Sequence, residues 1–252
     1  MTEELNILHD IASRLDTAGI DYMLTGSVAL ACHAQPRMTR DIDLVVAFFL
    51  KDAARITDVL GSGYYVSKEA AREAVLRQSS FNAIHEATLI KVDFMVRERE
   101  DYRLHEFARR VKVRLADFEL WVVSKEDLIL SKLEWARESL SERQLTDVEN
   151  LVATGCDEAY LRTSTHMVSR IEPDRYADTG FAVKDTPPEI NRRLFDAMMR
   201  KTPGERLLMS LDMMATAREL VMQGIQREAG MVSGIEMKRL AFQRLHGEPC
   251  PW

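Results

Sequence analysis

The segment from residue 22 to residue 46 constrains the fold of this chain most strongly. It reads as an apolar strand, a glycine turn, a short helix, a loop containing a proline and a second strand. In the second strand Asp41 and Asp43 alternate with Ile42 and Leu44. Because successive side chains of a strand point to opposite faces, we expect both carboxylates on one face. Two neighbouring anions are tolerated when both are solvated or when a divalent cation lies between them, and Mg²⁺ suits such oxygen ligands.

The turn that precedes this strand has the composition of an anion-binding site. Gly26 permits a tight turn after the first strand, and Ser27 stands where the following helix begins. The first N–H groups of a helix have no partner within the helix, so they are available to bind an anion. The sequence therefore predicts an anion site shortly before a pair of acidic residues.

Composition and charge narrow the class of protein. With 252 residues, of which 46% are hydrophobic, the chain can bury a substantial core in one or two domains. The formal net charge of −6 argues against non-specific wrapping of nucleic acid, although local basic patches can still bind RNA. The three cysteines are too widely spaced for a disulfide framework or a zinc site, which favours a reducing cytoplasm.

Neither export nor membrane insertion is expected. The first residues, Met1-Thr-Glu-Glu, are acidic where a signal peptide would be basic. The longest apolar run, residues 44–50, is far shorter than the roughly 20 residues that a spanning helix requires.

Hydrophobic periodicity predicts a mixed α/β chain around the two strands. Helices are expected at residues 3–18, 51–60 and 67–78, and strands at residues 81–85, 89–96, 111–115 and 118–123. In the strand over residues 89–96, Val92 and Phe94 alternate with Asp93, which is therefore opposite the apolar face. Asp93 is a third acidic candidate in the same kind of position as Asp41 and Asp43.

A strong helix is expected after Ser124, because Ser124-Lys-Glu-Asp127 resembles a capping box. Within this helix Lys132 has apolar neighbours one turn before and one turn after it. Its ammonium group therefore either extends to water or reaches an anion in a cleft. A following helix, from about residue 145, carries Asp147, for which an ordinary ion pair with Arg143 one turn earlier is the simplest interpretation.

Residues 97–114 allow two interpretations. They contain six arginines, but the acidic residues among them favour a solvated face over a nucleic-acid patch.

The C-terminal part of the chain is expected to be helical. Residues 157–171 look helical, and residues 172–188 read as a linker. A capping box over residues 202–205 then begins a helix whose apolar stripe predicts either core packing or a partner-binding element; its members are Leu207, Leu211, Met214, Val221 and Ile225.

One combination of residues within positions 20–155 indicates a protein family more specifically than any of its motifs does alone. It consists of Gly26-Ser27, Arg37-x-Thr39-x-Asp41-Ile-Asp43-Leu44, Asp93, Lys132-Leu133, Ala136, Arg137 and Asp147. This combination resembles the DNA polymerase beta-like nucleotidyltransferase superfamily, and its later motifs resemble the abortive-infection and toxin-type branch. The resemblance implies a mixed β-sheet nucleotidyltransferase core flanked by helices, which we expect in residues 1–155. A helical C-terminal region is expected in residues 156–252.

The resemblance also implies a reaction. An acceptor attacks the α-phosphorus of an NTP, and pyrophosphate leaves. Two Mg²⁺ ions about 3.5–4 Å apart can stabilise the attacking and the departing oxygen. Asp41 and Asp43 are expected to bind these ions, and Asp93 is expected to complete the acceptor-side ion and to help deprotonate the acceptor.

Other residues of the combination are expected to bind the substrate. Gly26 and Ser27, with the amides of the helix start, would hold the β- and γ-phosphates. Lys132 would be a point-charge ligand of a phosphate. Arg37, Thr39 and Asp147 are expected to complete the substrate-binding set, although Arg37 and Asp147 each have a plausible role in a structural ion pair.

The acceptor and the partners are less constrained. The toxin-type resemblance points to RNA, such as tRNA, as the acceptor. A transferase that modifies a small molecule, such as an antibiotic, or a protein is the nearest alternative. A non-catalytic interaction module on the same fold, with the C-terminal helices as the contact surface for a protein partner, is an alternative of a different class. The presence of all three carboxylates favours the enzyme.

Overall fold

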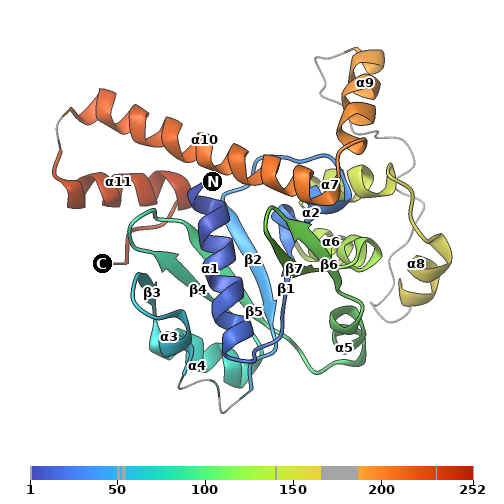
Figure 1. Cartoon of the computed structure of the whole chain (residues 1–252), viewed down its shortest axis with the longest axis horizontal. Helices are drawn as coiled ribbons and strands as arrows, with labels where there is room; N and C mark the ends of the chain where they lie inside the picture. Colours follow the sequence, from blue (N-terminus) through green and yellow to red (C-terminus); the bar gives the residue numbers. More distant parts are fainter. Residues whose placement is uncertain are drawn as a thin grey trace. The chain divides into compact units, whose positions relative to one another are not determined.

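The computed structural model describes residues 2–49, 52, 55–139, 141–165, 187–230 and 232–251. The chain divides into two compact units, each built from separate stretches of sequence. Unit 1 comprises Met1–Tyr22, Arg37–Val96 and Leu208–Trp252, and unit 2 comprises Met23–Pro36 and Arg97–Leu207. Each unit combines parallel and antiparallel strand pairs with helices (Figure 1), so the predicted class, a mixed sheet flanked by helices, is confirmed.

The strands of unit 1 follow the order β3-β4-β5-β2. β2 (Asp41–Val46) runs parallel to β5 (Lys91–Val96). β5 is antiparallel to β4 (Ser80–His85), which is antiparallel to β3 (Tyr64–Val66). In β2 and β5 every second side chain is buried, as the alternation predicted. The polar residues of both strands therefore share the face opposite these buried side chains.

The helices of unit 1 come from the first 77 residues and from the C-terminal part of the chain. They are α1 (Glu3–Thr17), α3 (Ile56–Leu60), α4 (Lys68–Arg77), the part of α10 (Pro203–Ala229) from Leu208 onward, and α11 (Gly234–His246). α10 and α11 lie side by side as an antiparallel pair (Figure 1), and Arg244 of α11 pairs with Glu228 of α10. A buried cluster joins this helix pair to the sheet; it contains Ile84, Leu89, Ile225, Ala241 and Phe242.

Unit 2 contains the strands in the order β1-β7-β6. β1 (Tyr22–Thr25) is parallel to β7 (Phe118–Val122), and β6 (Val111–Leu115) is antiparallel to β7. The helices of this unit are α2 (Gly26–His33), α5 (Asp101–Ala108), α6 (Lys125–Ser139), α7 (Glu142–Val152), α8 (Glu158–Thr165) and α9 (Pro188–Met199). In the part of the chain that the structure describes, no helix is both long and apolar enough to span a membrane.

Most predicted elements are present, with shifted ends. The helix expected over residues 51–60 is described only as α3, from Ile56 onward, and the helix expected from about residue 145 begins at Glu142. The end of the helix expected over residues 157–171, and the linker up to residue 186, lie outside the described residues. α5, α9 and α11 were not predicted. The predicted domain boundary between residues 155 and 156 stays a prediction.

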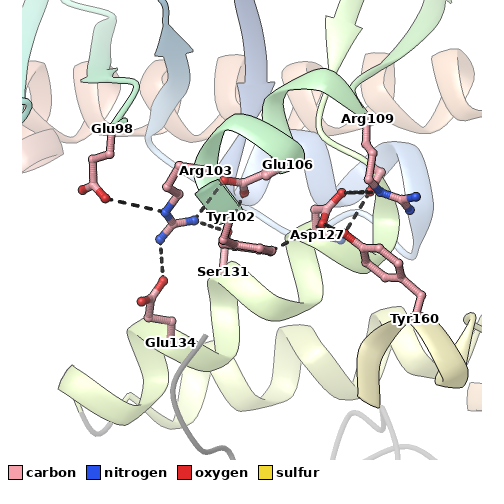
Figure 2. A network of polar contacts seen from close by, with 10 residues as sticks. Glu98, Tyr102, Arg103, Glu106, Arg109, Asp127, Ser131, Glu134 and Tyr160 are labelled. Carbon is pink, nitrogen blue, oxygen red and sulfur yellow. Dashed lines mark hydrogen bonds and ion pairs between the residues drawn. The ribbon is translucent and has the colours of Figure 1, made fainter. Parts of the chain in front are cut away.

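Arg103 of α5 and Arg109 at its C-terminal end take part in a network of polar contacts (Figure 2). Arg103, whose side chain is 21% exposed, contacts the carboxylates of Glu98, Glu106 and Glu134. Arg109 donates to Asp127 Oδ2 at 3.0 Å, and the hydroxyl group of Tyr160 donates to Asp127 Oδ1. At these two arginines the expectation of a simple solvated face is incomplete, because Arg103 also pairs with Glu134 of α6, and Arg109, whose side chain is 35% exposed, pairs with the buried Asp127.

Candidate active site

The sheet of unit 1 places the three predicted aspartates on one face. The parallel register of β2 and β5 sets Asp43 opposite Asp93 and Asp41 opposite Lys91. Residues directly opposite each other on neighbouring strands point to the same face, so these four side chains form one polar strip. Asn82 of β4, opposite Asp93, extends the strip by one strand.

Lys91 lies among the carboxylates and partly offsets their charge. Its Nζ atom is 3.4 Å from Asp93 Oδ2. Burial raises the pKa of Asp93 above its usual value; Lys91 opposes this shift, and the negative charge of Asp41 adds to it. Burial alone would lower the pKa of Lys91, but Asp41 and Asp93 outweigh it, so the net shift is upward. The strip therefore favours a bound positive charge.

His246, at the end of α11, reaches the same face. Its Nδ1 atom is 3.1 Å from Asp41 Oδ1, and its Nε2 atom is 3.0 Å from the carbonyl oxygen of Leu89. The side chain of His246 is only 2% exposed. No sequence motif pointed to His246, whereas the alternation of Lys91 with Asp93 in one strand was a usable signal for Lys91.

The donor set fits Mg²⁺, although the side chains are not arranged as a closed metal site. Three carboxylates on one face supply the hard oxygen ligands that this ion prefers. Within the described residues, no three His, Cys, Asp or Glu side chains are grouped so that they could hold an ion. Lys91 contacts Asp93 Oδ2, and His246 contacts Asp41 Oδ1.

In unit 2 the glycine turn and the short helix are formed as predicted. Gly26 has a φ of 65°, a left-handed conformation that a residue without a side chain adopts at little cost, and α2 begins there. Ser27 is therefore in the first turn of α2, near the N–H groups that a helix leaves unpaired. At the other end of α2, Arg206 donates to the carbonyl oxygens of Ala31, at 3.0 Å, and Cys32.

Lys132 of α6 and Asp147 of α7 form a buried ion pair in unit 2. The Lys132 Nζ atom is 2.6 Å from Asp147 Oδ2, and it also donates to Gln144 Oε1 at 3.1 Å. The two side chains are 5% and 2% exposed, so Lys132 does not extend to water. Arg143, the expected partner of Asp147, is itself exposed. The approach of Lys132 to the aspartates of β2 stays a prediction.

The loop between α2 and β2 carries the other two predicted substrate-binding residues. Arg37 donates to the carbonyl oxygen of Met38 at 3.0 Å. Thr39 lies at a small pocket of unit 1 whose wall also includes Arg218 and His246. No substrate contact follows from these positions alone, so the binding roles of Arg37 and Thr39 stay predictions.

The chain thus combines a mixed sheet that displays three aspartates on adjacent parallel strands with a helix that begins at Gly26-Ser27. The family model described as "Nucleotidyl transferase AbiEii toxin, Type IV TA system" matches residues 12–227. The chain therefore belongs to the AbiEii nucleotidyltransferase toxin family. The predicted resemblance to the toxin-type branch is confirmed, and the protein is a nucleotidyltransferase enzyme.

Solved structures with a similar chain trace include an antibiotic-resistance factor, a lincosamide antibiotic adenylyltransferase and a nucleotidyltransferase-like protein. The antibiotic-resistance factor ANT(2'')-Ia has 15% identity and a TM-score of 0.45, over 65% of this chain and 91% of that chain. The lincosamide antibiotic adenylyltransferase LnuA, with lincomycin bound, has 18% identity and a TM-score of 0.43, over 61% and 98%. An antigenic nucleotidyltransferase-like protein from Paracoccidioides brasiliensis has 18% identity and a TM-score of 0.44, over 61% and 77%. No curated protein sequence matches this chain.

Proposed function

We propose that this protein transfers a nucleoside monophosphate from an NTP to RNA, such as tRNA, in a Mg²⁺-dependent reaction. The observation that carries the proposal is the register of β2 and β5, which sets Asp43 opposite Asp93 with Asp41 two residues away on the same face. Membership of a nucleotidyltransferase toxin family supports the reaction class. RNA as the acceptor rests on the toxin-type motifs alone.

The three aspartates have distinct tasks in this reaction. Asp41 and Asp43 would hold the Mg²⁺ ions, Asp93 would complete the acceptor-side ion, and the ions would stabilise the negative charge on the phosphate oxygens. Asp93 takes the proton from the acceptor hydroxyl as its oxygen forms a bond to the α-phosphorus. The bond from this phosphorus to the bridging oxygen breaks, and pyrophosphate leaves with the electron pair.

The residues of unit 2, together with the loop before β2, bind the nucleotide in this proposal. The amides at Gly26 and Ser27 hold the β- and γ-phosphates, as helix starts commonly do. Lys132 contributes a positive charge to the phosphates, and Asp147 holds the ammonium group in position, as their 2.6 Å ion pair allows. Arg37 and Thr39 complete the binding set.

The family description also supports a proposal about the cellular compartment and the protein partner of this enzyme. A toxin of a type IV toxin–antitoxin system acts inside the cell that makes it, alongside an antitoxin, so we propose a cytoplasmic enzyme with an antitoxin as its counterpart. The thiols of Cys32, Cys156 and Cys250 are free, which is compatible with a reducing compartment. The C-terminal helices are the proposed contact for a protein partner.

A labelling experiment tests the reaction. The protein is incubated with each of the four labelled NTPs, Mg²⁺ and total cellular RNA, and in parallel with cellular protein and with small-molecule acceptors. We expect label on RNA, and a loss of more than about 100-fold in an Asp41→Asn, Asp43→Asn double variant, because metal ligands are removed. Asp117→Asn, an exposed residue outside the strip, is the matched control and should retain activity.

Three outcomes would contradict parts of the proposal. Transfer that persists in the double variant would refute the role of the carboxylates. Label on protein or on a small molecule, with none on RNA, would replace the acceptor. The absence of any Mg²⁺-dependent NTP binding would favour the non-catalytic interaction module.

A further inference from the structure

The imidazole ring of His246 is held at both of its nitrogen atoms. Nε2 lies 3.0 Å from the carbonyl oxygen of Leu89, and Nδ1 lies 3.1 Å from Asp41 Oδ1. The carbonyl oxygen and the carboxylate oxygen both accept hydrogen bonds, so the imidazole ring is the donor in a hydrogen bond to either of them. The geometry therefore places a ring donor of His246 against Asp41.

The position of this ring is fixed by the packing of α11. Phe242, one turn before His246, is buried, and the centroids of the two rings are 4.6 Å apart. Ala241 and Phe242 belong to the cluster that also contains Leu89, the residue whose carbonyl oxygen accepts from Nε2. Lys238 adds a hydrogen bond from α11 to the carbonyl oxygen of Glu86, at 2.8 Å. The ring is therefore anchored to the chain segment that leads directly into β5.

Asp41 gains a defined orientation from this contact. The side chain of Asp41 is 32% exposed, so solvent and packing leave it considerable freedom. The hydrogen bond from His246 engages Oδ1 and leaves the carboxylate group one other oxygen with which to bind a cation. Outer partners that fix the orientation of metal ligands commonly change metal affinity by about 10–100-fold when they are removed.

We propose that His246 is a positioning residue of the nucleotidyltransferase site, which holds Asp41 in the orientation that binds the divalent cation. This inference rests on the proposed function, because it assumes that Asp41 is a cation ligand. It assigns a residue of the last helix to the catalytic machinery. α11 is then a functional part of unit 1 as well as a packing element.

Two isosteric substitutions separate the two hydrogen bonds of the ring. In His246→Asn the amide nitrogen takes the place of Nδ1 and can still donate to Asp41. In His246→Gln the amide nitrogen takes the place of Nε2, so only the bond to Leu89 can be kept. We expect His246→Asn to bind Mn²⁺ within about threefold of the wild-type affinity and His246→Gln to bind it at least about 10-fold more weakly.

The binding measurement needs no turnover. Mn²⁺ is titrated into the full-length protein without NTP and followed by electron paramagnetic resonance, with Ile235→Ala, at an exposed position of α11, as a control that leaves the contact with Asp41 intact. Transfer assays should show that raising the Mg²⁺ concentration restores His246→Gln. Wild-type affinity in His246→Gln, or equal losses in the Asn and Gln variants, would overturn the proposal.

Two further measurements keep the outcomes distinct. An Asp43→Asn variant serves as the reference for the proposed function: if it binds Mn²⁺ like the wild type, the carboxylate site itself is wrong. If Asp43→Asn loses Mn²⁺ and His246→Gln does not, only the role of His246 fails. A crystal structure of the wild-type protein with Mn²⁺ bound requires no variant, and an Asp41 carboxylate that binds the ion without contacting His246 would refute the proposal even if both His246 variants misfold.

Discussion

The buried ion pair of Lys132 and Asp147 allows a structural role of the lysine to be separated from a catalytic one. Replacing Lys132 with Met keeps most of the side-chain volume and removes the ammonium group. Asp147, at 2% exposure, then loses the cation that lies 2.6 Å from it. Asp147→Asn in the same chain removes the remaining charge, because the amide is nearly isosteric with the carboxylate.

The structure indicates the size of the effect. Both side chains are at most 5% exposed, so solvent screening does not reduce it. Removing one partner of a buried pair typically costs about 3–5 kcal/mol, whereas neutralising both partners is often close to neutral. At about 2–4 °C per kcal/mol for a chain of this size, Lys132→Met should lower the melting temperature by roughly 6–20 °C. The double variant should regain most of this loss.

Urea unfolding at pH 7, followed by circular dichroism, measures the free energy of unfolding of the wild type and of the single and double variants. Nucleotidyl transfer is measured well below the lowest melting temperature. If Lys132 binds phosphate, the double variant regains stability but not activity. A loss below about 1 kcal/mol in Lys132→Met, or a double variant as unstable as the single one, would refute the electrostatic reasoning. Recovery of activity in the double variant would refute the phosphate-binding role.

Two further perturbations test unit 2. Arg206→Met should lower the free energy of unfolding by about 2–4 kcal/mol, because buried carbonyl groups at the end of α2 lose a charged donor. In the same urea experiment Arg206→Lys should recover only part of this free energy, since a single ammonium group replaces the planar guanidinium group. Burial lowers the pKa of His33 to about 4, so from pH 6.5 down to 4 the unfolded state binds the proton first. The free energy of unfolding of the wild type should therefore fall over this pH range by about 2–3 kcal/mol more than that of His33→Gln. The glutamine keeps a donor to the carbonyl oxygen of Val123. Equal pH profiles of the two proteins would contradict the role of His33.

The carboxylate face could be predicted because its signal is local. Alternation with period two in β2 and β5 determines which face each residue of a strand occupies, and both strands show it without exception. The parallel register that sets Asp43 opposite Asp93 could not be predicted from local alternation. It depends on the packing of the buried faces, so the sequence predicted three acidic positions but not their alignment.

Long-range partners were predicted less well than elements. Local spacing suggested Arg143 as the partner of Asp147, but the structure pairs Asp147 with Lys132 of the preceding helix. Local charge balance suggested a solvated face for residues 97–114, yet Arg109 reaches the buried Asp127 (Figure 2). In both cases tertiary packing provides a buried partner, which a pattern limited to one helix cannot reveal.

The last helix, α11, is a further case in which local sequence patterns did not reveal long-range contacts. The match to the family model ends at residue 227, but the packing of unit 1 continues through α11, where Ala241 and Phe242 are buried against Ile84 and Leu89. A chain that lacked α11 would expose this apolar surface and would also lose the hydrogen bond from His246 to Asp41. Deletion of the helix therefore cannot distinguish a packing role from a positioning role. Only substitutions at the ring of His246, with the rest of α11 intact, change the orientation of Asp41 without changing the buried cluster.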